Sequence, residues 1–333
     1  MKPKVSKAQV LITGVYRTGS EFFTHLLNSF SEVSASMYRV NLLRFIYKRY
    51  CPINSSRNLE RALDDLNIRL KQRYSIDINK ENFLSRIDIE SISYGELYDQ
   101  LMTFLYLENS SALIWAEKCQ LVWRESSDFI EIMKNGKVIL IHRDPRSILA
   151  SFKHYTNAPK PRYLGAIFNS FDAMQYGLIL EKKYPSKFLN IRYEDLILNE
   201  LFSMEKVAKF LNLTNEAYNF KQEQLFDAYG KPWISNSSFQ SNEEGVYYDK
   251  KICISRWKEV LSKSEVELTE KICSKMMAEY GYEPSLSMAN DSVYNLLKGD
   301  HLTESYLMNF LTNGEGIQAF PSDPLNSINW EKN

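Results

Sequence analysis

Two kinds of segment alternate along the chain: short continuous apolar runs, and longer stretches with apolar residues at helical spacing. The apolar runs, each of which predicts a buried strand, cover residues 10–13, 112–116, 137–142 and 188–191. The helical spacing covers residues 22–27, 59–74, 94–107, 145–155 and 164–183. Strands that alternate with helices predict an α/β fold, with a mostly parallel sheet flanked by helices on both faces.

The same pattern predicts the domain organisation. Residues 38–108 are largely helical in pattern and stand between the first strand and the second, which predicts a helical insertion. We therefore expect one α/β domain over residues 1–283, a length that can bury a full core. After Pro284 the chain becomes polar and less periodic, so we expect residues 284–333 to form an appendage of uncertain order.

Composition narrows the classes of partner. The chain has 41 Lys and Arg against 41 Asp and Glu, so bulk charge does not support a nucleic-acid or membrane-surface partner. The four cysteines are far apart, which favours reduced thiols over a zinc site. No apolar run approaches the roughly 18 residues that a transmembrane segment needs, and the first strand begins too early for a signal peptide. We expect a cytoplasmic protein.

A glycine-bounded loop, GVYRTGS at residues 14–20, lies between the first strand and the first helix. A loop of this kind is an anion cradle, because backbone N–H groups point inward and the helix dipole favours negative charge. Its glycines have the spacing of a nucleotide P-loop, but Ser20 and Glu21 stand where that motif has Lys and Ser or Thr. The cation is instead Arg17, inside the loop. This combination favours a phosphosulfate over a triphosphate.

Each predicted strand is followed by a cation, and the carboxyl ends of parallel strands meet at one edge of a sheet. These cations, which predict a local anion site, are Arg17, Lys118, Arg143 and Arg192. The alternative is that they cap the sheet and pair with the neighbouring carboxylates Glu117, Asp144, Glu194 and Asp195.

In several patches between about residue 9 and residue 262, the chain resembles the sulfotransferases that use 3′-phosphoadenosine 5′-phosphosulfate (PAPS), particularly the carbohydrate-type branch. The resemblance implies a P-loop-like α/β fold, PAPS as sulfuryl donor and no metal. GVYRTGS resembles the family's 5′-phosphosulfate loop, which implies that the donor is bound by Gly14, Tyr16, Arg17, Thr18, Gly19 and Ser20.

Other patches resemble the rest of the family's donor site. Arg143 and Ser151, eight positions apart, match its Arg/Ser pair for the 3′-phosphate. Tyr193 belongs to a matching Tyr-Glu-Asp segment at the end of a strand. The remaining matches, which resemble a loop that covers the donor, contribute Trp233, Ser237, Arg256 and Trp257.

The resemblance implies an in-line displacement in which an acceptor oxygen attacks sulfur. Arg17, the loop amides and Lys118 would stabilise the growing charge. The general base is open: Gln120 stands where cytosolic relatives have His and cannot accept a proton, and Tyr38 stands near the place of a Glu in carbohydrate-type relatives. Glu117, beside Lys118, is the candidate base.

Glu21 departs from the family, since many relatives have Ser or Thr at this position. A carboxylate there would repel the donor, and we expect a capping box in which Thr18 and Glu21 cap the first helix.

We expect a PAPS-dependent sulfotransferase that acts on a hydroxyl or amine of a glycan, lipid or small metabolite. Two alternatives stay open, a non-catalytic nucleotide- or glycan-binding relative and a P-loop metabolite kinase. The segments 38–108 and 156–183, where we expect the acceptor pocket, carry no motif that identifies the acceptor.

Overall fold

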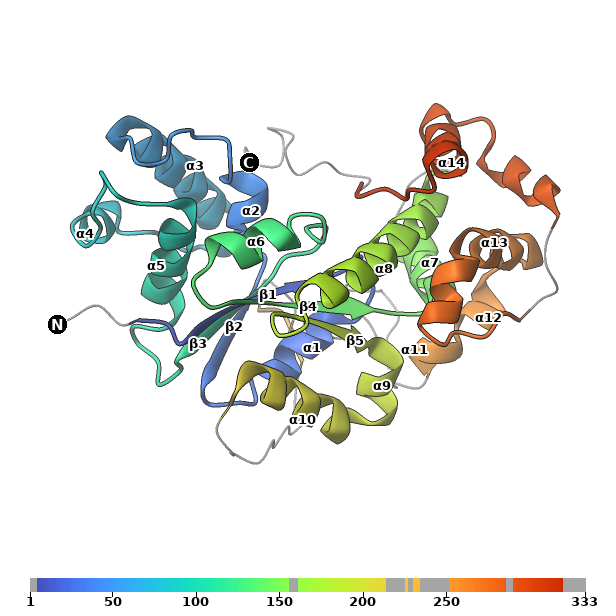
Figure 1. Ribbon diagram of the computed structural model, residues 1–333, viewed down its shortest axis with the longest axis horizontal. Helices are drawn as coiled ribbons and strands as arrows, with labels where there is room; N and C mark the ends of the chain where they lie inside the picture. Colours follow the sequence, from blue (N-terminus) through green and yellow to red (C-terminus); the bar gives the residue numbers. More distant parts are fainter. Residues whose placement is uncertain are drawn as a thin grey trace.

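The computed structural model describes residues 5–155, 161–213, 225–226, 230–233, 252–285 and 290–319. A five-stranded sheet in the order β2-β3-β1-β4-β5 runs through its centre (Figure 1). All neighbouring strands pair in parallel, which confirms the predicted fold class. The strands are β1 (Ala8–Thr13), β2 (Val33–Met37), β3 (Ile114–Lys118), β4 (Gly136–His142) and β5 (Phe188–Arg192).

Among the strands of the sheet, the edge strand β2 is the one that the apolar pattern does not predict. Its sequence is VSASM, and its second and third residues, Ser34 and Ala35, are only half-buried. An edge strand with two serines lacks the continuous apolar run of a central strand. Its pairing with β3 nevertheless extends the sheet and brings Met37 opposite Lys118.

Helices cover both faces of the sheet (Figure 1). One face carries α1 (Ser20–Leu27), α9 (Tyr193–Leu198) and α10 (Glu200–Leu211), whose apolar residues join Val10, Ile12 and Ile139 in one core cluster. The opposite face packs against a larger cluster that includes Leu11, Trp115 and Leu140. The helices that contribute to that cluster include α3 (Ser56–Tyr74), α5 (Tyr94–Tyr106), α6 (Ser126–Ile132), α7 (Pro145–Tyr155) and α8 (Gly165–Lys183).

The helical segment between β2 and β3 lies beside α6 at one end of the molecule (Figure 1). It contains α3 and α5 with the shorter α2 (Leu42–Phe45) and α4 (Lys80–Leu84). The predicted helical character is therefore confirmed for most of this segment. Between Tyr38 and Tyr50 only α2 is α-helical, and the backbone turns sharply at Tyr38 and Asn41, whose φ angles are 59° and 44°.

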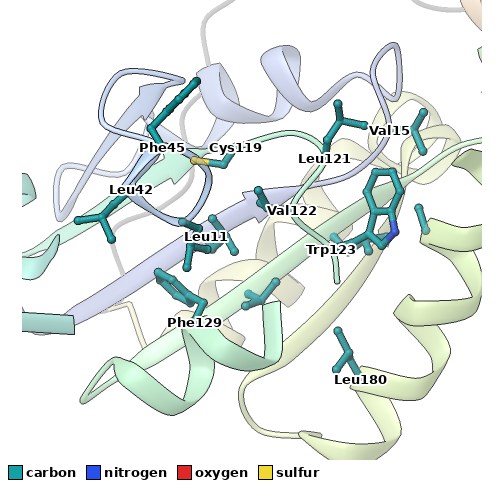
Figure 2. Close-up of a cluster of buried hydrophobic side chains, with 14 of the residues drawn as sticks. Leu11, Val15, Leu42, Phe45, Cys119, Leu121, Val122, Trp123, Phe129 and Leu180 are labelled. Carbon is teal, nitrogen blue, oxygen red and sulfur yellow. The ribbon is translucent and has the colours of Figure 1, made fainter. Parts of the chain in front are cut away.

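The segment that follows β3 is part of the core. Figure 2 shows side chains of this segment, including Cys119, Leu121 and Trp123, among those of Leu11 and Phe129. The Trp123 indole donates a hydrogen bond to the buried Asp172 carboxylate, at 2.7 Å. The chain is thus fixed on the C-terminal side of Lys118.

The C-terminal part is docked on the domain over its described residues. The helices here are α11 (Ile252–Ser255), α12 (Trp257–Val260), α13 (Lys263–Glu279) and α14 (His301–Asn313), with the 3₁₀ helix η2 (Asp291–Leu297). A further 3₁₀ helix, η1 (Arg162–Leu164), directly precedes α8. Beyond α14, Ala319 and the Asn169 side chain exchange two hydrogen bonds of 2.9 and 2.6 Å. Gln318 accepts a hydrogen bond from the backbone of Arg124 at 2.9 Å. The described part of the predicted appendage therefore contacts α8 and the segment after β3.

Across the described ranges, no helix combines the length and the apolar character needed to span a bilayer.

Candidate functional site

The glycine loop lies between the central strand β1 and α1, at the carboxyl edge of the sheet. Gly14 has a φ of 149°, and a Cβ built on it would lie 2.4 Å from the Ile141 carbonyl oxygen. Gly19 has a φ of 84°, and its Cβ would lie 2.2 Å from the Tyr193 ring. Both positions therefore require glycine, because a side chain would push the loop away from β4 or from α9. The Tyr193 ring therefore packs directly against the loop at Gly19.

The start of α1 corrects one expectation. Gly19, which has no side chain, is the N-cap residue, so the predicted capping box of Thr18 and Glu21 is wrong. The Thr18 hydroxyl instead donates to the Val15 carbonyl at 2.9 Å, inside the loop. Glu21 points to β3, where its carboxylate lies 2.7 Å from the ammonium of Lys118.

Three residues of the predicted donor site come together around the loop. Arg17 has a φ of 72°, and its Nε donates to the Ser151 hydroxyl on α7 at 2.9 Å. An Nη1 hydrogen of Arg143, which follows β4, is donated to the Arg17 carbonyl at 2.8 Å. The sequence predicts Arg143 and Ser151 as a pair, and in the structure Arg17 connects them.

The guanidinium of Arg143 is buried but is not neutralised by an ion pair among the described residues. It donates to the backbone carbonyls of Arg17 and Cys253, and its carbon lies 4.5 Å from the centroid of the Tyr193 ring. Its Nε is buried and has no hydrogen-bond partner within the described residues. A buried cation with an unused donor is suited to an anionic ligand, because burial without a partner is unfavourable.

Lys118, at the end of β3, is fully buried and pairs with Glu21. Its Nζ also lies 4.1 Å from the centroid of the Tyr38 ring. The Tyr38 ring in turn stacks with Tyr16 of the loop, with centroids 6.2 Å apart and planes at 17°. Burial lowers the pKa of Lys118 to about 8, although Glu21 acts in the opposite direction. The side chains of Glu21, Lys118, Tyr38 and Tyr16 thus form one cluster beside the loop.

Glu117 does not have the geometry of a general base. Successive residues of a strand point to opposite faces of a sheet, so Glu117 and Lys118 diverge. The fully buried Glu117 carboxylate accepts hydrogen bonds from the backbone N–H groups of Val40 (2.7 Å) and Asn41 (2.9 Å) and from the Tyr98 hydroxyl. Burial raises its pKa. Its role in the structure is to hold the segment 38–41.

Arg69 was not suggested by any motif in the sequence. It is buried on α3, and its guanidinium donates to the carbonyls of Tyr38 and Arg39. The short segment 38–41 is therefore fixed twice, by a cation on its carbonyls and by the Glu117 carboxylate on its amides. This double anchor positions Tyr38 against Lys118.

Gln120 and Ser20 are also buried together, and the Gln120 amide donates to the Ser20 hydroxyl at 2.9 Å. Ser20 therefore uses its side chain to fix the loop to the segment after β3.

Arg192 lies apart from the other three cations. It follows the edge strand β5, where it is 3.5 Å from Glu194 and stacks over the Tyr282 ring at 4.4 Å. Together with His142 and Lys206 it lines a separate cavity of about 480 Å³. For Arg192 the alternative of a sheet-edge ion pair is the better description.

The predicted covering loop is described only in part, and Ser237 lies outside the described residues. Trp233 is half-buried, and its ring meets the edge of His25 at 6.1 Å. Arg256 lies beside the Arg143 partner Cys253, with 3.7 Å between Nη2 and Sγ. Trp257 is buried in the core under the Arg146 guanidinium, at 4.2 Å, a geometry that favours packing over donor contact.

Comparisons with known proteins agree with the fold. A solved sulfotransferase domain of the Synechococcus PCC 7002 olefin synthase superposes with a TM-score of 0.53 at 13% identity, over 85% of this chain and 98% of that one. The sulfotransferase domain of the curacin biosynthetic pathway gives 0.52 at 18% identity, over 84% and 99%. At these identities the similarity concerns the fold.

Sequence comparison leads to the family. Carbohydrate sulfotransferase 1 of Rattus norvegicus and that of Homo sapiens are each 24% identical to this chain over 176 residues, which are 46% of the chain. The match spans only 40% of the length of these curated relatives. The sequence model of the sulfotransferase family matches residues 9–217, which include the loop, Lys118, Arg143 and Ser151. This chain therefore belongs to the sulfotransferase family.

Proposed function

We propose that this protein transfers the sulfuryl group of PAPS to a hydroxyl or amine of an acceptor. The observation that carries the proposal is the meeting of Arg17, Ser151 and Arg143 at the glycine loop of the central strand. The family match includes all three residues and supports the assignment.

The residues fit a ligand with anionic groups at two ends. Gly14 and Gly19 keep the loop free of side chains where it packs on β4 and Tyr193. Arg143 offers a buried, unused Nε, and Ser151 stands two turns further along α7. Arg143 and Ser151 would hold the 3′-phosphate, while the loop amides and Arg17 would hold the 5′-phosphosulfate.

PAPS, when bound, supplies an activated sulfuryl group attached to a phosphate. Transfer forms a bond between the acceptor oxygen or nitrogen and sulfur, and breaks the bond between sulfur and the bridging oxygen. Arg17 and Lys118 would stabilise the negative charge that develops on the departing phosphate. Positioning by the rigid loop contributes as well, because both reactants are then held in line.

The acceptor proton must also leave, and Glu117 cannot receive it in this geometry because its carboxylate is enclosed and saturated with donors. The base therefore stays unassigned. No group of three His, Cys, Asp or Glu side chains able to hold a metal occurs in the part of the chain that the structure describes.

For the acceptor we propose a glycan, a lipid or a small metabolite, and the names of the curated relatives favour a glycan. The stacked rings of Tyr16 and Tyr38 lie beside the loop and could pack against a sugar ring. A binding protein without catalysis is the second candidate, and the enclosure of Glu117 is the observation that favours it.

The test has two steps. Thermal shift and calorimetry with adenosine 3′,5′-bisphosphate, AMP and ATP should show a clear preference for the 3′-phosphorylated nucleotide. Labelled PAPS and a panel of glycans, lipids and phenols should then show label transfer. A preference for ATP would overturn the proposal, whereas binding without transfer to any acceptor would favour the second candidate.

A further inference from the structure

Glu21 places a negative charge next to the loop that we expect to bind an anion. In a P-loop with the usual spacing, this position carries the hydroxyl that binds magnesium. Here it carries a carboxylate in the first turn of α1, the helix that directly follows the loop. Its side chain is 12% exposed and its Oε1 lies 2.7 Å from Lys118 Nζ.

The ion pair cancels the charge of Lys118, and Arg17 remains as a cation at this end of the site. Lys118 is completely buried, so Glu21 and Lys118 face each other in a region from which water is largely excluded. The charged groups around the pair are Arg17, which acts on Lys118, and His25, one helical turn from Glu21. At the Arg143 end, by contrast, the structure describes no ion pair on the guanidinium.

Two isosteric ligands differ in the charge that they would bring to this end. The terminal sulfuryl group of PAPS carries a single negative charge at neutral pH. The terminal phosphate of 3′-phosphoadenosine 5′-diphosphate carries nearly two, because the second pKa of such a phosphate is about 6. The carboxylate of Glu21 therefore repels the phosphate-ended ligand by close to one extra charge.

We propose that Glu21 determines donor selectivity: it cancels the charge of Lys118 and so admits a monoanionic sulfuryl group while rejecting a dianionic phosphoryl group. This inference rests on the proposed function, because it assumes that the loop receives the 5′ end of the donor. It explains why a carboxylate that repels anions is placed at an anion cradle.

A purely structural role for Glu21, as the counter-ion of a buried lysine, predicts something different. Removing the carboxylate would then lower stability and leave the ratio of the two affinities unchanged. The selectivity role predicts a change of that ratio, which a loss of stability alone does not produce.

The experiment measures binding of PAPS and of 3′-phosphoadenosine 5′-diphosphate by calorimetry without metal, for the full chain and for E21Q. We expect the unmodified protein to prefer PAPS by ~10-fold or more, and E21Q to bind both ligands more tightly, with a preference below ~3-fold. Glu32→Gln is the matched control, because Glu32 pairs with Lys7 before β2, at the opposite edge of the sheet. It should keep the preference of the unmodified protein.

A second variant covers the case in which E21Q does not fold around an unpaired Lys118. Lys118→Met keeps the Glu21 carboxylate and removes the charge that cancels it, so the preference for PAPS should increase in this variant, whereas a purely structural role leaves the ratio unchanged. An unchanged ratio in either folded variant overturns the inference and leaves the proposed function intact. Failure of both ligands to bind the unmodified protein would instead overturn the proposed function.

Discussion

Arg143 and Lys118, the two cations that flank the glycine loop, have different partners in the structure. Arg143 is buried with backbone carbonyls as hydrogen-bond partners and an unused Nε, and the buried Glu194 carboxylate interacts with its charge without forming an ion pair to it among the described residues. Lys118 is buried at the other side with Glu21 at 2.7 Å, so its charge is cancelled. This difference gives the proposed donor site one buried cation without a described ion pair and one buried cation that is held in such a pair. It also makes the two ends separable by experiment.

The largest effect is expected at Arg143. Arg143→Ala should weaken binding of adenosine 3′,5′-bisphosphate by ~10²- to 10³-fold, because it removes a buried cation that forms no ion pair with a carboxylate among the described residues. Calorimetry measures the loss. Arg162→Ala, which alters an exposed arginine paired with Asp300, is the control and should leave affinity unchanged.

Arg143 also holds the carbonyls of Arg17 and Cys253, so its loss could disturb the loop itself. Arg143→Lys keeps the charge and serves as the comparison, with the melting temperature of each variant measured alongside. If Arg143→Ala folds and still binds the nucleotide normally, the assignment of Arg143 to the 3′-phosphate is wrong.

The second largest effect is expected at Gly19, in the glycine loop that Arg143 and Lys118 flank. Gly19→Ala should lower affinity for the same nucleotide by ~10-fold and destabilise the fold by about 1–3 kcal/mol, because the new methyl group would meet Tyr193 at 2.2 Å. Gly314→Ala carries a similar backbone strain, with a φ of 66°, but has no atom within 4 Å of the new Cβ. Equal behaviour of the two variants in calorimetry and thermal melts would mean that the Tyr193 contact is unimportant.

Donor affinity should depend on alkaline pH through Lys118. The pKa of Lys118 is lowered to about 8 in the folded protein from an ordinary value of 10.5, whereas arginine keeps its charge. Donor affinity should therefore fall by ~3- to 10-fold above pH 8 as Lys118 loses its proton. Binding curves from pH 7 to 10 test this, and Lys118→Met should flatten them.

Stability should change in the other direction over the same range. Between about pH 8 and 10.5 the unfolded chain holds a proton that folded Lys118 has lost, so the contribution of this group to stability rises with pH. Denaturant titrations of the unmodified protein and Lys118→Met should differ in this slope. Parallel slopes would show that Lys118 keeps an ordinary pKa.

The smallest effect on chemistry is expected from Glu117. Glu117→Gln should lower stability by about 1–3 kcal/mol, since an amide cannot accept all the donors around the carboxylate. Once an acceptor is found, its turnover should keep the pH profile of the unmodified protein. A loss of turnover of ~10²-fold or more in a folded variant, with that profile changed, would restore Glu117 as a base.

Periodicity alone predicts much of the fold. The helix over residues 145–155 is α7 with the same bounds, and the central strands lie where the apolar runs place them. The edge strand β2 is missed because its serines and half-buried positions interrupt the apolar run. The cap of α1 is predicted wrongly because the loop tightens before the helix, which makes Gly19 the N-cap residue.

The candidate site, like the fold, can be predicted from the sequence only in part. The loop, Arg143 and Ser151 can be found from motifs, because the order of the strands brings their ends together. Alternation along β3 is enough to separate Glu117 from Lys118, although adjacency in the sequence suggests that they act together. The contacts of Lys118 with Glu21 and Tyr38 join residues about 80 to 97 positions apart, and no local pattern records them. Whether these residues hold the donor stays a prediction.

The double anchor on segment 38–41 limits how this fold can be redesigned. Arg69 comes from the helical segment and Glu117 from the sheet, yet both form hydrogen bonds with the backbone of residues 38–41. A graft that exchanged only the helices for those of a relative would leave one buried charge without its counterpart. If the acceptor pocket lies in the helical segment, as we expect, β3 must be transplanted along with the helices, so the exchangeable unit is larger than the insertion seen in the sequence.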